Sequence, residues 1–483
     1  MNTYAVQNTI LFLLSKAFNE LFQPRQIVIE HSFGDGLFCH SVNWEKISND
    51  ELNRLEEQLI NWIDNPVEIV LDSQPRKNVQ LDLQNLNSLS KLELLRQWKG
   101  DWIPLIHFGP HWDLQLGEME TNKSLLKIFQ LLKYNDGFII RFQNDKGIFP
   151  PFKDQPKLFS IIEEHEQWGT ILRISTIREL NELIRSGDIQ EMIWVAEGLH
   201  EKKISDISDH IVNDFPHKRI IPIAGPSSSG KTTFAKRLGI QLRVNGFNTI
   251  QISMDDYFID RGDLKPNHEG ELDFESIDSI NMDLLCHRLN ELLNGKNIPK
   301  REYDFQTGRG HDTEETIILG NRDFILLEGI HGLNPVLREK MGSMRCQRIY
   351  VSAITQMNID ANHRVSTSDN RLIRRMVRDY KYRGYSSMET LTRWPMVRHG
   401  EDMNIFPFQE EADFMFNSSL VYELPVLAKY AIPLLKDIGK DSLFAIEAER
   451  LKTFLSFFEV IDEELVRRIS ILREFIGGSE FNY

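Results

Sequence analysis

The sequence predicts an α/β fold built on a parallel sheet, preceded by a domain of the α+β type. Beyond residue 218, apolar runs alternate with helical patterns, which is typical of a parallel sheet with helices on both faces. A glycine-rich segment, GPSSSGKT at 225–232, lies between the first of these runs and a helical pattern. Residues 1–170 lack this alternation. The two patterns therefore indicate at least two domains in a chain of 483 residues.

The first half mixes helical and strand-like segments. Residues 9–21 and 49–64 are predicted to be helices. Residues 27–31, IVIEH, have the composition of a strand, and a glycine-containing turn at 32–36 follows them. We expect an α+β domain over 1–170.

A helical connector is predicted between the two halves. Most of residues 171–214 carry apolar side chains at helical spacing, with an interruption at Ser186-Gly187-Asp188. Phe215-Pro216-His217 then ends the pattern, because proline interrupts a helix. We expect a connector over 171–214 and a new domain from residue 215.

The second half follows the alternation of a parallel sheet. Its apolar runs have the length of buried strands and lie at 220–224, 248–254, 323–327 and 346–351. Helical patterns at 231–244 and 279–293 separate them. We predict one α/β domain over 215–435, followed by C-terminal helices over 436–483.

Composition and charge exclude several classes of protein. The chain is 41% hydrophobic, 26% charged and 10% aromatic, unlike disordered, collagen-like or disulfide-rich proteins. Its formal charge of −15 repels phosphate backbones, which argues against nucleic-acid binding outside a local basic patch.

Cysteine spacing and the N-terminal segment bear on the compartment. None of the three cysteines lies in a CxxC pair, so neither a disulfide framework nor a zinc ribbon is predicted. The N-terminal segment has neither a basic region nor an apolar run long enough for a signal peptide or a membrane span. We expect a cytoplasmic protein without a membrane segment.

The glycine-rich segment matches GxxxxGK[ST], the phosphate-binding P-loop, between a predicted strand and a predicted helix. Backbone N–H groups of such a loop surround phosphate oxygens, and a glycine-rich turn without a ligand is the alternative. Lys231 is expected to contact the transferred phosphate, and Thr232 to ligate Mg²⁺. The predicted nucleotide-binding residues are Gly225, Ser227, Ser228, Ser229, Gly230, Lys231, Thr232 and Thr233.

Carboxylates follow two of the predicted strands, where α/β sheets place catalytic groups. Asp255 and Asp256 come after the second apolar run, and Glu328 ends the third. One of the two aspartates is a candidate base for a hydroxyl proton, and the alternative is that they cap the next segment. Glu328 is placed to orient Mg²⁺ or its water.

A basic patch lies at 364–383, a segment that contains seven arginine and lysine residues and only two aspartates. Its arginines include four that share one helix face by their i, i+3, i+4, i+7 spacing: Arg371, Arg374, Arg375 and Arg378. We interpret them as a lid that stabilises γ-phosphate charge. The alternative is a solvated charged face.

Residues 218–430 resemble the uridine kinase and phosphoribulokinase group of P-loop kinases. The resemblance rests on GPSSSGKT, ISMDDYF, YDFQTGR (303–309), LLEGIHGL (326–333) and RLIRRMVRD (371–379). It implies an ATP- and Mg²⁺-dependent kinase with Asp255, rather than Asp256, as the base. It also implies that Asp273 holds ribose hydroxyls and that Tyr303 and Phe305 line the base pocket.

One position departs from that family. Many of its members have a base-contacting histidine three residues after the YDF phenylalanine, and this sequence has Gly308. Arg309, which we include among the substrate residues, or His311 could replace that contact, and exposed loop positions are the alternative for both. The departure leaves base selectivity open and admits a non-nucleoside sugar as the acceptor.

The N-terminal half resembles the second additional domain of threonyl-tRNA synthetases, which edits mischarged tRNA. The resemblance rests on HSFGDGLFC (31–39) and HFGPH (107–111). The editing site needs HxxxH on the first helix and a cysteine in the turn, and this sequence has neither. Gly109-Pro110 makes a helical metal pair of His107 and His111 improbable, so we expect a docking or regulatory module with structural histidines.

Three hypotheses for the function follow. The first is transfer of the γ-phosphoryl group of ATP to the 5′-hydroxyl of a pyrimidine nucleoside, with uridine preferred. The second is a kinase for another small sugar or sugar phosphate. The third is an RNA-associated regulatory protein with a vestigial editing domain, which the acidic N-terminal half argues against. A homo-oligomer stays open.

Overall fold

The computed structural model describes residues 3–144, 146–264, 273–342, 346–355 and 357–482. Its contacts divide the chain into two compact units, both discontinuous in sequence. Unit 1 contains residues 1–189, 355–367 and 445–461, and unit 2 contains 190–354, 368–444 and 462–483. The contiguous domains predicted over 1–170, 171–214, 215–435 and 436–483 stay a prediction about which parts fold independently.

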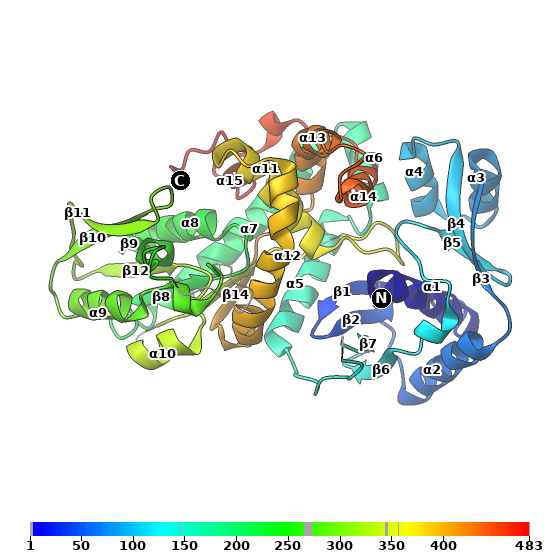
Figure 1. The fold of residues 1–483 in the computed structure, drawn as a ribbon, viewed down its shortest axis with the longest axis horizontal. Coiled ribbons are helices and arrows are strands. Elements are labelled where there is room, and N and C mark those ends of the chain that lie inside the picture. Colours follow the sequence, from blue (N-terminus) through cyan, green and yellow to red (C-terminus); the bar gives the residue numbers. More distant parts are fainter. Residues whose placement is uncertain (1–2, 145, 265–272, 343–345, 356, 483) are drawn as a thin grey trace. The chain divides into compact units, whose positions relative to one another are not determined.

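Unit 1 begins with a helix and then alternates strands and helices (Figure 1). Its strands are β1 (Ile27–Phe33), β2 (Gly36–Ser41), β3 (Ile69–Pro75), β4 (Trp102–Phe108), β5 (His111–Leu114), β6 (Phe129–Tyr134) and β7 (Gly137–Phe142). Its helices are α1 (Thr3–Leu21), α2 (Asn49–Asp64), α3 (Arg76–Asn85), α4 (Leu89–Gln97), α5 (Pro156–Leu172), α6 (Ile177–Ser186) and α14 (Ala445–Leu455), with a short 3₁₀ turn, η1, at Lys123–Leu125. The helices predicted at 9–21 and 49–64, and the strand at 27–31, are confirmed.

The first sheet of unit 1 is antiparallel, in the order β1-β2-β7-β6, and it is buried on both faces. Ile27, Ile29 and Cys39 belong to a core shared with α1 and α2. On the other face, Phe38 contacts Phe159 of α5 edge to face, with ring centroids 5.1 Å apart. Every residue of β2 is therefore buried.

Two consecutive polar residues of β1 lie inside the protein, beside an irregularity in its pairing. The pairing of β1 with β2 is irregular between Ile29 and Ser32. Glu30 and His31 lie within that irregularity, and both are buried. Both faces of this sheet are covered, so two consecutive side chains of β1 can both be buried.

The second sheet of unit 1 has the order β3-β4-β5 and carries the two histidines of HFGPH. Gly109 lies in the turn between β4 and β5 with φ +56°, so the segment is a hairpin rather than a helix. His107 Nε2 lies 4.0 Å from Asp72 Oδ2, and His111 Nε2 lies 3.0 Å from Glu20 Oε2. Each histidine thus has its own acidic neighbour, and the two do not form a metal site together among the described residues.

A buried charge cluster draws residues from three parts of unit 1. Asp113 accepts hydrogen bonds from Lys16, at 2.6 Å, and from Lys91. Asp360, from the inserted segment 355–367, is 2.9 Å from His363 Nδ1, and its charge acts on Lys91. Burial opposes the charge on Asp113, but the two lysines outweigh it and hold the pKa of that carboxyl well below its usual range.

Unit 2 holds a parallel sheet and the helices that cover it (Figure 1). Its strands are β8 (Ile220–Ala224), β9 (Asn248–Ser253), β10 (Ile298–Asp304), β11 (Arg309–Ile317), β12 (Asp323–Glu328), β13 (Ile349–Ser352) and β14 (Phe414–Asn417). Its α-helices are α7 (Ile189–Val212), α8 (Lys231–Val244), α9 (Met282–Leu293), α10 (Pro335–Met341), α11 (Thr367–Tyr382), α12 (Ser387–Asn404), α13 (Glu423–Lys436) and α15 (Arg473–Ile476). Its 3₁₀ turns include η2 (Met254–Tyr257), η3 (Ile277–Ser279), η5 (Phe406–Glu411) and η6 (Glu463–Leu465).

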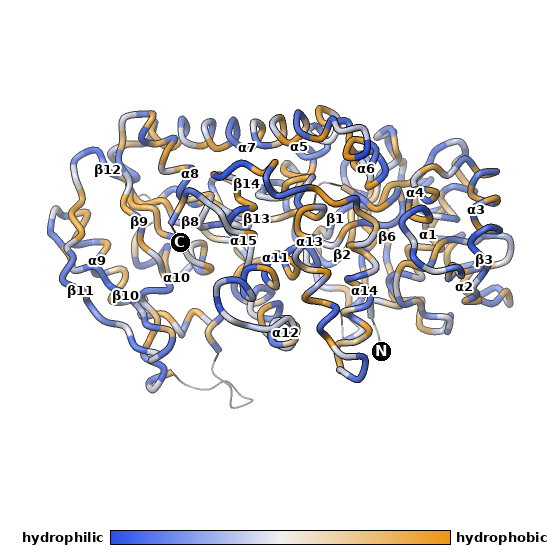
Figure 2. The backbone as a smooth tube through the Cα atoms, turned by 90° about the horizontal axis from the view of Figure 1, so that it is seen from above, coloured by the Kyte–Doolittle hydropathy of each residue, from blue (hydrophilic) through white to orange (hydrophobic). Residues whose placement is uncertain are grey.

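The five-stranded sheet is parallel and has the order β14-β13-β8-β12-β9. Helices α9 and α10 share a core with one face of the sheet. On the other face, Phe234 of α8 and His200 of α7 both contact Phe416 of β14. The α/β fold with helices on both faces is confirmed, and Figure 2 colours the central strands largely as hydrophobic.

Helix α7 starts where the predicted connector is interrupted. Gly187 ends α6 in the left-handed region, with φ +86°, which confirms the break at 186–188. From residue 190 onward the helix belongs to unit 2.

None of the helices within the described residues is both long and apolar enough to cross a bilayer.

A buried glutamate fixes α7 to the rest of unit 2. Glu197 Oε1 accepts a hydrogen bond from the Tyr422 hydroxyl at 2.6 Å, and its Oε2 is 3.4 Å from Arg237 Nη1. The Glu197 and Arg237 side chains are 1% and 2% exposed. Arg237 also pairs with Glu201, one turn further along α7, at 2.7 Å.

We expect Glu197→Ala to destabilise the protein by roughly 3–5 kcal/mol, because it removes one partner of a buried ion pair and an acceptor of the Tyr422 hydroxyl. Urea unfolding of the full chain measures the loss. Lys202→Ala is the matched control, since Lys202 is exposed on the same helix. A midpoint for Glu197→Ala that equals that of the control would contradict the role of the buried pair.

Candidate active site

The P-loop joins β8 to α8 and can exist only with glycine at both ends. A Cβ on Gly225 would meet Val351 O at 2.0 Å. Gly230 has φ +81°, and a Cβ there would meet Ile471 Cγ2 at 2.5 Å. The loop is therefore held tightly between β13 and the C-terminal segment of unit 2.

Lys231, the first residue of α8, lies over the loop. Its Nζ donates hydrogen bonds to Gly225 O at 2.9 Å and to Pro226 O at 3.2 Å. Desolvation lowers the pKa of Lys231, and the carboxylates of Glu328, Asp255 and Glu474 oppose that shift. The ammonium group thus has three acidic neighbours, which together form the centre of the site.

Thr232 and Glu328 meet beside this lysine. The Thr232 hydroxyl donates to Glu328 Oε1 at 2.7 Å, and Glu328 is the last residue of β12. Desolvation raises the pKa of Glu328 to about 7, while Lys231 and Thr232 act in the opposite direction. A hydroxyl and a carboxylate are oxygen donors of the kind that Mg²⁺ binds, so these two side chains fit that ion.

The two adjacent aspartates of η2 face different neighbours. The charges that act on Asp255 are those of Lys231, Arg383 and Arg378, whereas Asp256 lies beside Asp255 and the β10 residues Tyr303 and Glu302. Asp255 stays accessible to solvent, yet desolvation raises its pKa. The structure therefore turns Asp255, and not Asp256, toward the cations of the P-loop.

Two arginines of α11 support the P-loop from inside the protein. Arg371 donates to Ser227 O at 3.1 Å and pairs with Glu401, which itself accepts from Ser227 N at 2.9 Å. Arg374 donates to Ser228 O at 3.3 Å and pairs with Glu423. The side chains of both arginines and both glutamates are at most 2% exposed.

Three further arginines of the basic patch are held by Asp379. The Asp379 carboxylate is 3.2 Å from Arg375 Nε, 2.8 Å from Arg378 Nη2 and 3.6 Å from Arg383 Nη1. Arg375 also donates to the Ser227 hydroxyl at 2.8 Å. Arg378 and Arg383 are the members whose charges reach Asp255. The four arginines predicted as one lid thus occupy two environments.

Three of the four predicted acceptor residues lie on the β10–β11 hairpin, and Asp273 lies outside it. The rings of Tyr303 and Phe305 lie 5.1 Å apart, and Phe258, after η2, lies 5.5 Å from Tyr303. Tyr303 is buried, whereas Phe305 is 59% exposed. Arg309 is exposed at the start of β11, and Asp273 accepts from Glu275 N at 2.9 Å.

Position 308 requires glycine because of its backbone conformation and its close neighbours. It has φ +70°, and a Cβ there would meet Arg261 Cβ at 2.7 Å. Arg261 N donates to Gly308 O, and the Arg261 guanidinium donates to Phe305 O, both at 2.8 Å. Arg261 therefore occupies the space that a side chain at position 308 would need.

Sequence reasoning missed two carboxylates of the site. Glu474 accepts from Thr233 N at 3.1 Å and from the Thr233 hydroxyl at 2.7 Å, across 241 residues of sequence. Desolvation raises the pKa of Glu275 to about 7, and Asp255 and Lys231 are among its charged neighbours. No motif marks Glu474, whereas Glu275 lies two residues after the predicted Asp273.

The comparisons with known proteins agree with this geometry. Residues 220–423 match the model of the "Phosphoribulokinase / Uridine kinase family". The uridine kinase of Staphylococcus epidermidis is 30% identical over 198 residues, which are 41% of this chain and 86% of the relative. A uridine kinase of Staphylococcus aureus is 31% identical over the same shares.

Among solved structures, one described as a possible uridine kinase from Bacillus stearothermophilus is 18% identical. It covers 45% of this chain and 98% of its own, with a TM-score of 0.31. The family match ends at residue 423, so Glu474 lies outside it.

A kinase-family match over the parallel sheet, the P-loop and α11 identifies unit 2 as a phosphotransferase with an alcohol acceptor. Kinases of the P-loop type generally use ATP and Mg²⁺. The match includes Lys231, Thr232, Asp255 and Glu328. The chain belongs to the phosphoribulokinase/uridine kinase family.

Proposed function

We propose that the protein transfers the γ-phosphoryl group of ATP to the 5′-hydroxyl of a pyrimidine nucleoside, with uridine preferred. The observation that carries the proposal is the position of Asp255, beside the P-loop lysine and next to a hairpin with two aromatic rings. The relatives named uridine kinase support the choice of acceptor.

In this proposal, Asp255 accepts the proton of the acceptor hydroxyl. Its carboxylate is accessible to an incoming molecule, and Lys231, Arg383 and Arg378 keep it in a positive field. Asp256 takes no part in proton transfer, because the cation that acts on it is Lys300 and not the P-loop lysine. The base is therefore selected by orientation rather than by residue type.

The cationic side chains of the site have different roles according to whether they are buried and already paired. Lys231, Arg378 and Arg383 offset negative charge on the transferred phosphate, because they surround Asp255. Arg375 reaches the Ser227 hydroxyl and acts at the edge of the loop. Arg371 and Arg374 hold the loop in place, because each already has a buried carboxylate partner.

Thr232 and Glu328 would hold Mg²⁺, whose charge, when bound, neutralises phosphate oxygens. The P-loop residues from Gly225 to Thr233 would hold the phosphates of ATP through backbone N–H groups. Glu474 fixes the first turn of α8, from which Lys231 and Thr232 extend. The C-terminal segment is thus part of the proposed nucleotide site.

At the acceptor end, Tyr303 and Phe305 would line the base pocket with their rings edge to face, and Asp273 would bind ribose hydroxyls. Arg261 occupies the space beside Gly308, and Arg309 is exposed on the same hairpin. Both arginines are candidates for contacts with the exocyclic groups of the base. The same cations would suit a phosphorylated sugar, which makes the choice of acceptor the first thing to test.

An acceptor panel tests the proposal. With Mg²⁺-ATP, we expect coupled ADP release to give the highest kcat/KM for uridine and cytidine, against a purine nucleoside, a free pentose and a pentose phosphate. The Asp255→Asn variant provides the background ATPase rate. A pentose phosphate as the best acceptor would favour a sugar-phosphate kinase. No acceptor above background would reject the kinase and favour a regulatory role.

We expect Asp255→Asn to lower kcat by roughly 10²–10⁴-fold, because an amide cannot accept the hydroxyl proton. Binding of a non-hydrolysable ATP analogue should change by less than about threefold, since the carboxylate acts on the acceptor. Asp256→Asn is the matched control and should lower kcat by less than about tenfold. A larger loss in the control would reassign the base to Asp256.

We expect Glu474→Ala to weaken binding of the ATP analogue, because it leaves the N–H and hydroxyl of Thr233 without their acceptor. Losing such a buried acceptor costs about 1–3 kcal/mol, which is about a 5- to 150-fold rise in Kd if the loop absorbs it. Titration calorimetry measures the change. Glu480→Ala, exposed in the same segment, should bind like the wild type.

A further inference from the structure

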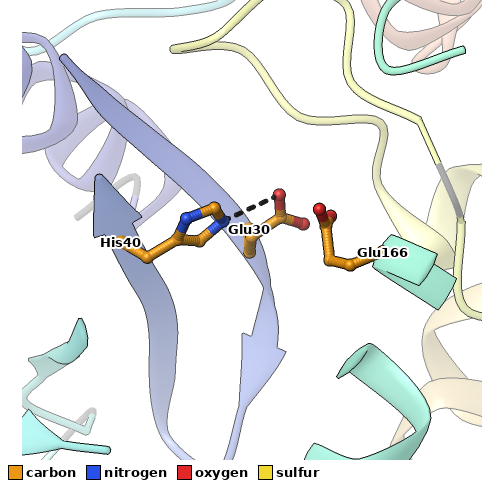
Figure 3. A group of neighbouring side chains, drawn as sticks. All are labelled: Glu30, His40 and Glu166. Carbon is orange, nitrogen blue, oxygen red and sulfur yellow. Dashed lines mark ion pairs between the residues drawn. The ribbon is translucent and has the colours of Figure 1, made fainter. Parts of the chain in front are cut away.

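Three polar side chains of unit 1 converge between the first sheet and α5. Glu30 lies on β1, His40 on β2 and Glu166 on α5 (Figure 3). One potential ligand atom of each lies within 4.8 Å of the other two. Glu30 and His40 are 5% and 2% exposed, so bulk water does not solvate them. The kinase chemistry proposed above uses none of these three residues.

The hydrogen bond at Nδ1 of His40 determines the role that the other ring nitrogen, Nε2, can take. His40 Nδ1 lies 2.7 Å from Ser41 O, and a carbonyl oxygen can only accept, so Nδ1 carries the hydrogen. When Nε2 carries no hydrogen, its lone pair therefore faces the Glu30 carboxylate. Within the described part of the chain, this Nε2 has no hydrogen-bond partner.

The distance from His40 to Glu30 is longer than that of a charge-assisted hydrogen bond. His40 Nε2 and Glu30 Oε1 are 3.5 Å apart. A charged N–H donating to a carboxylate brings the heavy atoms to about 2.7–2.9 Å. Two atoms bound to one zinc ion, each at about 2.0–2.2 Å, lie about 3.0–3.6 Å apart. The observed separation lies within the zinc range, and Glu30 Oε2 lies at a similar distance, 3.3 Å, from His31 Nε2.

The two carboxylates lie close enough to repel each other. One oxygen atom of Glu30 and one of Glu166 lie within 4.8 Å of each other. A cation bound between Glu30 and Glu166 would remove that repulsion. Oxygen atoms from two carboxylates and one imidazole nitrogen are a donor set that divalent transition metals accept.

Aromatic residues hold the ligands in place. The Trp44 ring stacks on His40, with centroids 3.9 Å apart and planes at 15°, and its side chain hydrogen-bonds to Glu166. Trp44 has φ +55°, a region that bulky residues seldom adopt. Phe38 stacks on the same imidazole at 5.9 Å. Such surroundings orient metal ligands in proteins.

We propose that Glu30, His40 and Glu166 bind a divalent transition-metal ion, with Zn²⁺ favoured. Mg²⁺ is disfavoured, because it prefers oxygen ligands in an octahedron and keeps several waters. Three protein ligands leave a coordination position open, as in sites where a metal-bound water reacts. The site is separate from His107 and His111, and it does not depend on the proposed kinase function.

Protons are the alternative occupants. One proton shared by Glu30 and Glu166, and one on His40 Nε2, would satisfy the same atoms. Arg364 acts electrostatically on His31, the neighbour of Glu30, and would add to the positive charge there. Direct measurement of metal separates the two cases.

The first experiment measures zinc on the full chain. The protein is stripped with a chelator and then dialysed to equilibrium against Zn²⁺, with excess Mg²⁺ present to occupy the kinase site. Elemental analysis should give one Zn²⁺ per chain, and thermal unfolding should shift upward with Zn²⁺. Absence of bound Zn²⁺ at micromolar concentrations would overturn the proposal and leave the proton network.

The second experiment assigns the ion to these residues. Glu166→Gln and His40→Gln should each weaken Zn²⁺ binding at least about tenfold. Glu163→Gln, exposed on the same helix, is the matched control, and Glu328→Gln tests for zinc at the kinase site. Both should retain wild-type affinity. Equal zinc binding by Glu166→Gln and the wild type would overturn the assignment.

Spectroscopy supplies a readout that does not depend on stability. Co²⁺ in place of Zn²⁺ should give visible d–d absorption in the wild type and in Glu163→Gln, and lose it in Glu166→Gln. Circular dichroism verifies that each variant is folded. If His40→Gln does not fold, Glu166→Gln decides, because Glu166 is only half-buried. Unchanged absorption in a folded Glu166→Gln would reject the site.

Discussion

The geometry of unit 2 depends on the hydrogen-bond donors that the protein supplies to the carbonyl groups of the P-loop. A loop that turns its N–H groups toward an anion must turn carbonyl oxygens into the protein, where each needs a donor. Arg371 and Arg374 donate to Ser227 O and Ser228 O, and the Ser418 hydroxyl donates to Ser229 O at 2.5 Å. Glu401 and Glu423 neutralise the arginines, which keeps two guanidinium groups stable inside the protein. The loop is thereby shaped for phosphate before any phosphate arrives.

This arrangement separates two tasks that one helix performs. The inner arginines of α11, Arg371 and Arg374, support the P-loop, whereas the charge of Arg378 acts on Asp255. A single buried carboxylate, Asp379, connects the outer arginines to each other. Movement of α11 would thus change both the shape of the loop and the charge near the base.

The sequence predicted what local pattern controls. Four of the five strands of the parallel sheet, the helices α8 and α9, the P-loop, and the break at 186–188 each have a signal within a few residues, and each was found, whereas β14 was not predicted. Helical spacing alone placed four arginines together but could not tell which carboxylates they meet, because Glu401 and Glu423 come from other helices. Glu474 gave no signal for the same reason. The Glu30 and His40 pair was also missed, because the pairing of β1 with β2 and the cover that α5 provides join residues that no local pattern relates.

The discontinuity of unit 1 has a consequence during synthesis of the chain. Its last segment, 445–461, follows most of unit 2 in sequence, and Asp360 and His363 of the charge cluster come from 355–367. The ribosome emits about 5–20 residues each second, so the stretch after residue 189 keeps unit 1 incomplete for some tens of seconds. During that interval Asp360 and His363 have not yet joined the cluster of Asp113, Lys16 and Lys91. Apolar surface of unit 1 also stays accessible to chaperones. Nascent chains stalled before residue 355 should therefore be more sensitive to protease in their N-terminal half than chains released after residue 461.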